Sequence, residues 1–269
     1  MKISAKLMKW FSVFFCMLLL SAPLTVLAQT KVVVIPLFGD DPKPLKNIIT
    51  VAKANGKFTD PVAAVNSITD ASADNPYLVV IGPGVYTINQ TLFMKEYVDI
   101  AGSGENVTKI KGAISTGNPD ASSAIISGAS NSALSSLTVE NNGGEYYSIA
   151  LYIDSASTTV RNVMATANSG VTETVGIRVL SCAPSIINVT ASAYGGTSYG
   201  VYNSTNSSPI IRQSVMEGQT NGLYTEADSV AKVGLSTIKN GVGGWNNKCL
   251  ACDDENGSPL NQFCIGIPE

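Results

Sequence analysis

A repeat in the centre of the chain restricts its fold more than any other feature of the sequence. Lines that start at Ala124, Ala150, Gly176, Gly200 and Gly222 open with similar residues, AIISG, ALYID, GIRVL, GVYNS and GLYTE. The starts are 26, 26, 24 and 22 residues apart, and each line ends in a polar or glycine-rich corner. A period of this length with short apolar segments predicts that each line forms one turn of a parallel β-helix.

Two columns of residues recur within these lines at the positions expected to face inward. Ten residues into the lines stand Leu134, Val160, Ile186, Ile210 and then Lys232, which Val233 follows. Thirteen residues in stand Leu137, Val163, Val189, Gln213 and Leu235. One coil cannot bury its apolar residues alone, so we expect stacked coils to bury them against their neighbours.

We therefore predict an all-β fold, a single-stranded right-handed parallel β-helix with a helical cap at its N-terminal end and a cysteine-flanked cap at its C-terminal end. The small fractions of aromatic (7%) and charged (14%) residues, with abundant Gly, Ser, Thr and Asn, fit short strands and tight turns. An N-terminal strand and lead-in are expected at residues 29–56 and the β-helix at residues 57–245. Its first coils are expected at residues 77–111.

The N-terminal cap is predicted as a short helix at about residues 60–69. Thr59 and Asp60 provide an N-cap and Pro61 suits the first turn, while Val62, Val65 and Ile68 recur at helical spacing. The open end of a β-helix exposes apolar residues and strand edges, so it needs such a cover. The C-terminal cap is expected at residues 246–269, where the repeat stops.

The first 28 residues have the pattern of a secretory signal. Three lysines precede an apolar run from Trp10 to Leu20, and Val26 and Ala28 are small residues before an expected cut. An uncleaved membrane anchor is the alternative. We expect the mature protein to be exported, to the periplasm or outside the cell, without an integral membrane segment. Removal of the three lysines changes the formal charge from −3 to about −6, which argues against nucleic acid and anionic membranes as partners.

Four cysteines follow the predicted cut, and pairing is the usual state in an exported protein. Cys249 and Cys264 bracket a turn-rich segment and are predicted to form a disulfide. Cys252 would reach Cys182 only if the tail folded back along the coil that starts at Gly176, so that pairing stays open. The chain has no histidine, and the acidic run at residues 253–255 lacks the ligand spacing of a calcium loop. We expect no metal and no cofactor.

Several short motifs near the start of the chain resemble those of a known enzyme family. VAKANGKF, AAVNSI, IGPGVY and IAGSGENVTKIKG, between Ile49 and about Gly112, resemble scaffold motifs of pectin methylesterases and the wider pectin-lyase-like superfamily. The chain also resembles uncharacterised exported bacterial β-helix proteins with a cysteine-flanked tail, here CDDEN. This resemblance implies the same right-handed β-helix.

The catalytic motifs of that family are absent from this sequence. The esterase needs an aspartate nucleophile, an aspartate acid/base, glutamines for an oxyanion site and an arginine. The segment GQTNGLY, Gly218 to Tyr224, resembles only the glutamine motif. Asp154 and Glu226 occupy equivalent positions three coils apart, about 14 Å at the usual strand spacing, which is wider than most hydrolytic pairs. Whether the chain is an enzyme is left open, and the missing motifs argue against it.

One column in the repeat is a candidate binding surface. Two residues into each line stand Ile126, Tyr152, Arg178, Tyr202 and Tyr224. Strand alternation predicts that this column points outward, so Tyr152, Arg178, Tyr202 and Tyr224 would form an exposed ladder. Tyrosine rings offer flat faces to sugars, and arginine binds carboxylates or stacks on tyrosine. The alternative is a ladder that stacks on itself and only stabilises the sheet.

These observations predict an exported, non-catalytic β-helix protein with a structural, adhesive or glycan-binding role. Its expected partner is a polysaccharide or a cell-surface glycan, and the sequence does not indicate an oligomeric state. The alternative is a polysaccharide-active enzyme of the pectinesterase or lyase type with an unfamiliar active site.

Overall fold

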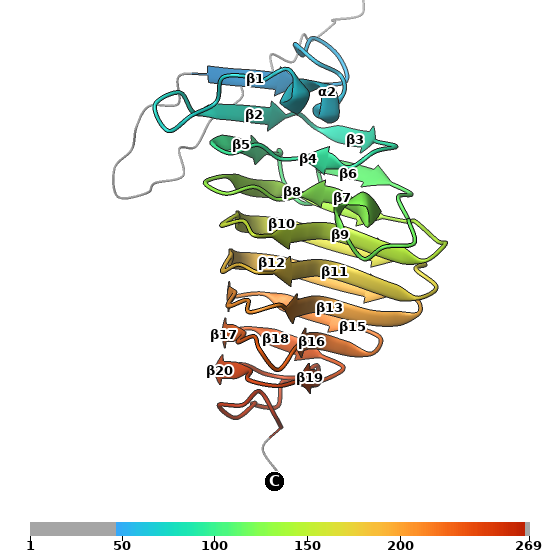
Figure 1. Ribbon diagram of the computed structural model, residues 1–269, viewed down its shortest axis with the longest axis vertical. Helices are drawn as coiled ribbons and strands as arrows, with labels where there is room; N and C mark the ends of the chain where they lie inside the picture. Colours follow the sequence, from blue (N-terminus) through green and yellow to red (C-terminus); the bar gives the residue numbers. More distant parts are fainter. Residues whose placement is uncertain (1–46, 267–269) are drawn as a thin grey trace, which may run out of the picture. The chain divides into compact units, whose positions relative to one another are not determined.

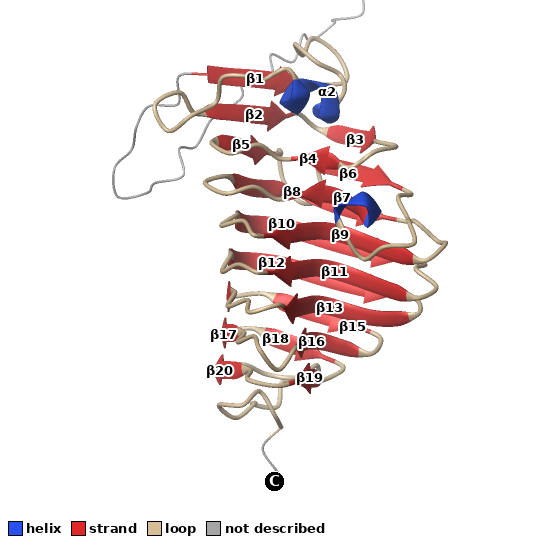
Figure 2. Cartoon of the chain, viewed as in Figure 1, coloured by secondary structure: helices blue, strands red, loops and turns tan. Residues whose placement is uncertain are grey.

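The computed structural model describes residues 47–266, which wind into a stack of coils built mainly from β-strands (Figures 1 and 2). Neighbouring strands from one coil to the next run parallel. The described part is therefore the parallel β-helix that the repeat predicted. The predicted signal sequence at residues 1–28 and most of the predicted lead-in, up to residue 46, lie outside the described residues.

Within the described range, seven strands form one sheet that runs along one side of the stack. In chain order they are β4 (Leu92–Phe93), β7 (Ala124–Ser127), β9 (Tyr147–Asp154), β11 (Glu173–Leu180), β13 (Thr197–Ser204), β16 (Asn221–Thr225) and β19 (Val242–Gly244).

A second sheet contains thirteen of the described strands. They are β1 (Asn47–Val51), β2 (Tyr77–Ile81), β3 (Gly84–Thr87), β5 (Val98–Ala101), β6 (Thr108–Gly112), β8 (Ala133–Asn141), β10 (Thr159–Asn168), β12 (Ser185–Tyr194), β14 (Ile210–Arg212), β15 (Val215–Gly218), β17 (Lys232–Gly234), β18 (Thr237–Lys239) and β20 (Lys248–Leu250). The long strands bend in the middle, so β12 pairs first with β14 and then with β15.

A column of left-handed residues makes this bend. Asn162 and Asn188 have φ angles of 52° and 51°, a conformation that asparagine tolerates better than most residues. They lie on adjoining coils, and Asn188 Nδ2 donates a hydrogen bond to Asn162 Oδ1 at 2.8 Å. The bend divides the thirteen-stranded sheet into two faces, so a regular coil has three sides.

The register of the strands confirms the first inward columns and corrects the later ones. Val160 pairs with Ile186 and Val163 with Val189, as the repeat predicted. Ile186 then pairs with Ile211, and Ile211 with Val233, so the predicted placement of Ile210 and Lys232 was wrong by one residue. The corner after β13 holds two consecutive left-handed residues, Thr205 and Asn206, and it is one residue longer than the corners before it.

The second column shifts by the same residue. The N–H of Val189 donates a hydrogen bond to the Ser214 hydroxyl oxygen at 3.2 Å, and the N–H of Ser214 donates to the Ser236 hydroxyl oxygen at 3.1 Å. Gln213 and Leu235, predicted to face inward, occupy the left-handed corner instead, with φ of 51° each. Leu235 is consequently exposed. Hydroxyl groups thus replace aliphatic groups in the core of the later coils.

Three glycines that open the predicted lines are required by close packing between two sides of the coil. A Cβ on Gly200 would lie 2.5 Å from the Glu217 nitrogen and 2.6 Å from the Gly222 oxygen. Gly176 and Gly222 show equally short approaches to backbone atoms of neighbouring strands. The repeat therefore marks the position where the seven-stranded sheet meets β12, β15 and β18.

Asn203 interrupts the apolar start of an inward column of the seven-stranded sheet, and the buried Thr225 follows it in register. Asn203 follows Ile153 and Val179 in register, is fully buried, and its amide oxygen and nitrogen have no hydrogen-bond partner within residues 47–266. A buried amide without partners costs about 1–3 kcal/mol.

We expect Asn203→Val to raise the free energy of unfolding by about 1–2 kcal/mol, because it removes this cost and continues the column from Val179. Urea unfolding of the variant beside the natural protein measures the change. Asn203→Asp is the opposing control and should destabilise the fold, since it buries a charge at the same place. Lower stability of the valine variant would show that Asn203 has a partner such as a buried water.

The helix α2 (Pro61–Asn66) covers the start of the stack (Figure 2). Asp60 is its N-cap, as predicted, and accepts hydrogen bonds from the N–H groups of Val62 and Ala63. The helix is shorter than the predicted 60–69, because Ser67 turns the chain and its hydroxyl donates to the Ala64 oxygen at 2.7 Å. Val62, Val65 and Ile68 are all buried in the same apolar core as the first coils.

The C-terminal segment folds over the edge of β20. The N–H of Cys249 donates to the Gln262 oxygen at 3.0 Å, and Cys249 and Cys264 are joined by a disulfide. Cys182 and Cys252 remain free thiols. The acidic run is a turn in which Asp254 Oδ1 accepts hydrogen bonds from the N–H groups of Asn256 and Ser258. A helix of the length and apolarity needed to cross a membrane does not occur in residues 47–266.

Candidate functional site: the tyrosine face

The outer surface of the seven-stranded sheet carries the predicted ladder. We call its outward residues on β9, β11, β13 and β16, with Glu226 after β16 and Trp245 after β19, the tyrosine face. Arg178 pairs in register with Tyr152 on one side and Tyr202 on the other, and Tyr202 pairs with Tyr224. These four residues form one column, as predicted. Ile126 does not belong to it, because it pairs with Leu151 and lies in the core.

The prediction that the whole column is exposed was wrong. Tyr152 and Arg178 are only 7% and 8% exposed, although they lie outside the core of the coils. Tyr152 packs in a second apolar cluster with Ala124, Ile149 and Val175, against which Ala121 also packs. Ala121 belongs to the one-turn 3-10 helix η1 (Ala121–Ser123), whose loop folds over this part of the sheet. Only the later members of the column, Tyr202 and Tyr224, are partly exposed.

Arg178 is held between an acid and an aromatic ring. Its Nη1 forms an ion pair with Glu173 Oε1, and its guanidinium lies 4.4 Å from the centre of the Tyr202 ring. Such a stack is favourable because the ring face is electron-rich. The guanidinium of Arg178 is therefore occupied by Glu173 and Tyr202, and it is not free to bind the carboxylate of an acidic sugar.

Three tyrosines pack together beside this arginine. The ring centres of Tyr199 and Tyr202 are 5.1 Å apart, those of Tyr199 and Tyr224 are 5.0 Å apart, and those of Tyr202 and Tyr224 are 5.2 Å apart. Tyr202 and Tyr224 are stacked at 19°, so the Tyr202 ring has Arg178 on one side and Tyr224 on the other. The sequence-based ladder missed Tyr199, because it stands on a neighbouring outward column.

Carboxylates surround the tyrosines. The Tyr202 hydroxyl donates to Glu226 Oε1 at 2.7 Å, and the Tyr152 hydroxyl donates to Asp154 Oδ2 at 3.3 Å. Burial raises the pKa of Tyr152 to about 12, and burial with the bond to Glu226 raises the pKa of Tyr202. Burial also raises the pKa of Glu173, against the opposing effect of Arg178. Each of these carboxylates is engaged by a neighbouring side chain.

Trp245 adds an exposed ring at the C-terminal end of the face. It directly follows β19, its N–H donates to the Thr225 oxygen at 2.8 Å, and its side chain is 68% exposed. This bond places the backbone of Trp245 beside Glu226 on the preceding coil. The repeat does not point to Trp245, since this residue lies after the last repeated line. An exposed tryptophan is unusual and is a feature that points to an interaction.

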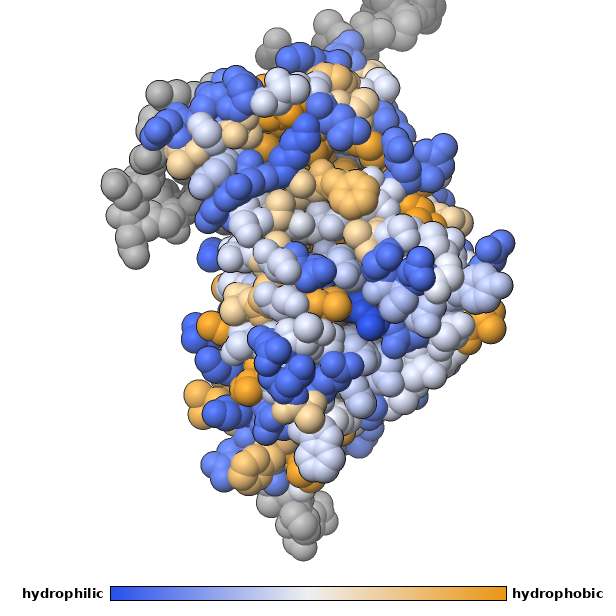
Figure 3. Space-filling view, in the orientation of Figure 1, coloured by the Kyte–Doolittle hydropathy of each residue, from blue (hydrophilic) through white to orange (hydrophobic). Residues whose placement is uncertain are grey.

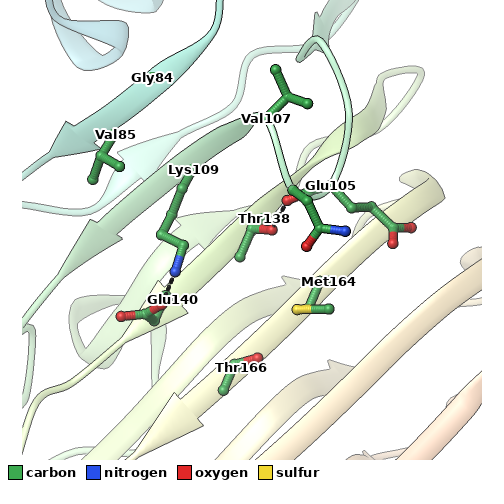
Figure 4. A pocket seen from close by; sticks show the side chains of 10 residues that line it. Gly84, Val85, Glu105, Val107, Lys109, Thr138, Glu140, Met164 and Thr166 are labelled. Carbon is green, nitrogen blue, oxygen red and sulfur yellow. Dashed lines mark hydrogen bonds and ion pairs between the residues drawn. The ribbon is translucent and has the colours of Figure 1, made fainter.

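A separate shallow cavity of about 260 Å³ lies on the other sheet (Figure 4). The loop around Glu105 overhangs it, and Thr138 donates a hydrogen bond to the Glu105 backbone oxygen. Lys109 Nζ and Glu140 Oε2 are 2.5 Å apart across its floor. The hydrogen bond from Lys109 lowers the pKa of Glu140, and the two side chains form an ion pair.

Comparison with known proteins identifies the fold but not a family. No protein-family model matches the chain, and no curated protein matches it. Among solved structures, the pectin methylesterase PemA from Erwinia chrysanthemi is similar with a TM-score of 0.52 and 14% identity, covering 84% of this chain and 94% of the enzyme. The chain shares the fold of pectin methylesterases.

Two further structures extend this likeness. Pectin methylesterase from carrot has a TM-score of 0.51 and 14% identity, over 85% of this chain and 90% of the enzyme. The ORF18 protein of Geobacillus virus E2 has a TM-score of 0.50 and 15% identity, over 76% of this chain and 42% of the viral chain. Identities this low indicate shared architecture, and function must be argued from the residues of this chain.

Proposed function

We propose that this protein is an exported, non-catalytic β-helix protein that binds a polysaccharide through the tyrosine face. The observation that carries the proposal is the cluster of Tyr199, Tyr202 and Tyr224 beside Glu226, with the exposed ring of Trp245 on the next coil. Aromatic rings provide rigid apolar surface for a sugar ring, and carboxylate oxygens accept hydrogen bonds from sugar hydroxyls.

The predicted ladder residues have different roles in this proposal. Tyr152 and Arg178 are buried and position their neighbours. The stacked Tyr202 supports the surface, and Tyr224 is partly exposed beside it. Trp245 then provides the main ring for stacking. Export is supported by the pattern of residues 1–28 and by the disulfide between Cys249 and Cys264.

A panel of neutral, acidic and amino polysaccharides tests the proposal. We expect the protein to be retained on at least one of them in affinity electrophoresis, with no release of methanol, unsaturated products or reducing ends. Absence of retention on the whole panel would refute glycan binding. Release of product would instead support the alternative of a polysaccharide-active enzyme.

That alternative has one specific observation in its favour, the raised pKa of Glu173 with a second carboxylate, Glu226, contributing to the shift. A carboxyl group with a raised pKa is a candidate proton donor, although Glu173 would have to leave its ion pair with Arg178 to serve as one. If any product is released, Glu173→Gln should abolish the release while retention on the polymer persists. Unchanged release in this variant would exclude Glu173 as the acid.

Two substitutions separate sugar stacking from support of the sheet. Trp245→Ala should weaken retention at least tenfold, about 1.4 kcal/mol, and leave the melting temperature unchanged because the ring is exposed. Tyr202→Ala should lower the free energy of unfolding by about 2 kcal/mol, because its ring is packed between Arg178 and Tyr224.

Thermal unfolding and affinity electrophoresis of both variants make this comparison. Tyr146→Ala is a matched control, since this tyrosine is 54% exposed on the turn before β9, outside the proposed surface. Unchanged retention of the Trp245 variant would contradict the role of this ring.

A further inference from the structure

Basic residues are concentrated on one face of the thirteen-stranded sheet, away from the tyrosine face. Outward positions of β10, β14, β17 and β20 carry four cations, and none of the outward positions of these strands or of β12 carries a carboxylate. The four cations are Arg161, Arg212, Lys232 and Lys248. We call them, with the apolar residues described next, the basic face.

The strand register places three of these cations close together, while Arg161 lies two coils from Arg212, with Ile187 between them. Lys232 pairs directly with Lys248, and Arg212 pairs with Gly234 beside Lys232. None of the four forms an ion pair with a residue in the range 47–266. Acids lie at the edges of the face: Asp228 is in the turn before β17, where its Oδ1 accepts a hydrogen bond from the Ser229 hydroxyl at 3.0 Å, and the acidic run at residues 253–255 follows β20. Like charges on adjoining strands repel and destabilise the folded protein, and an anionic partner would offset this repulsion.

Exposed apolar side chains lie at the same end of the face. Leu250 is 78% and Leu235 is 65% exposed, and the Leu235 N–H donates to the Leu250 oxygen at 3.0 Å. Phe263 and Ile265 are also exposed, and they flank Cys264, whose disulfide to Cys249 ties their segment to β20. Figure 3 shows orange and blue side chains interspersed at the lower left, where Figure 1 places β17 and β20.

The combination points to one class of partner. Cations alone would bind any polyanion. A charged polysaccharide, however, offers little apolar surface for contact with four exposed aliphatic and aromatic side chains. An anionic lipid surface uses both, because its phosphates attract lysine and arginine while its acyl boundary takes up apolar side chains. We propose that the basic face binds the protein peripherally to membranes that contain anionic phospholipid.

Cosedimentation with vesicles tests this proposal with the full chain. We expect the protein to bind vesicles of phosphatidylcholine with an equal amount of phosphatidylglycerol, and to bind vesicles of phosphatidylcholine alone much more weakly. Arg212→Glu with Lys248→Glu should weaken binding to the anionic vesicles about tenfold or more. Added salt should release the natural protein, since the attraction is screened.

Matched variants separate charge, apolar contact and folding. Lys53→Glu with Lys57→Glu makes the same change in charge at two exposed positions near the N-terminal end and should leave binding unchanged. Leu250→Ser with Phe263→Ser should also weaken vesicle binding. Because all these positions are exposed, the melting temperatures should stay equal.

Three results would overturn the proposal. The first is equal binding to neutral and anionic vesicles, and the second is unchanged binding of the Arg212 and Lys248 double variant. The third is retention of the protein on immobilised heparin without any binding to anionic vesicles, which would assign the basic face to an acidic polysaccharide.

Discussion

Replacing Val65 with Asp is expected to lower the free energy of unfolding by about 3–5 kcal/mol. Val65 lies on α2, is 1% exposed, and belongs to the apolar core shared by the helix and the first coils. A carboxylate at this position would have to lose its water without gaining a partner. The helix would then leave the end of the stack, and the apolar residues of the first coils would be exposed.

Chemical unfolding followed by circular dichroism measures this loss. Ala63→Asp is the matched control, because Ala63 is exposed on the same helix and an acid near a helix N-terminus is well tolerated. An unchanged unfolding midpoint for the Val65 variant would show that α2 does not cover the core.

Removal of the disulfide is expected to cost about 3 kcal/mol in the chain-entropy model. Cys249 and Cys264 are 15 residues apart in sequence, and their link ties the C-terminal segment to β20. Replacing both with Ala should therefore lower the melting temperature and expose the edge of the last coil. Peptide mapping without reductant should find these two cysteines joined.

A reducing agent provides the control for this prediction. It should lower the melting temperature of the natural protein and leave that of the double variant unchanged. A dominant linkage that involves Cys252 in the unreduced protein would contradict the assignment.

The sequence predicted the coils because inward residues must recur once per turn, and the regular lines keep that spacing. It misplaced Ile210 and Lys232 because a corner can lengthen without disturbing the sheets on either side of it. Thr205 and Asn206 absorb the extra residue in two left-handed conformations. A fixed count from the line start cannot detect this, whereas the register of Ile211 with Val233 shows it directly.

The sequence predicted which way the side chains of the candidate site point, but not how exposed they are. Alternation along a strand indicated that Tyr152 and Arg178 point away from the core, which the structure confirms. Tyr152 is covered by the loop that contains η1, and Arg178 is covered by its ion pair with Glu173. Alternation within one strand cannot predict such contacts. The charge distribution escaped prediction for a similar reason. The net charge of −3 is a sum over the whole chain. It does not show that the strand register places acids on the tyrosine face and cations on the basic face.

Consecutive coils match closely enough that whole coils can be inserted or deleted in the sequence. β10 and β12 present the same kinds of inward residue in register, with Val163 over Val189 and Ala165 over Ala191. Each coil meets only its neighbours, so a duplicated coil inserted between them would find compatible surfaces above and below. The protein can therefore be lengthened or shortened by whole turns. Such a change alters the distance between its two ends and leaves both caps and the Tyr202 surface intact.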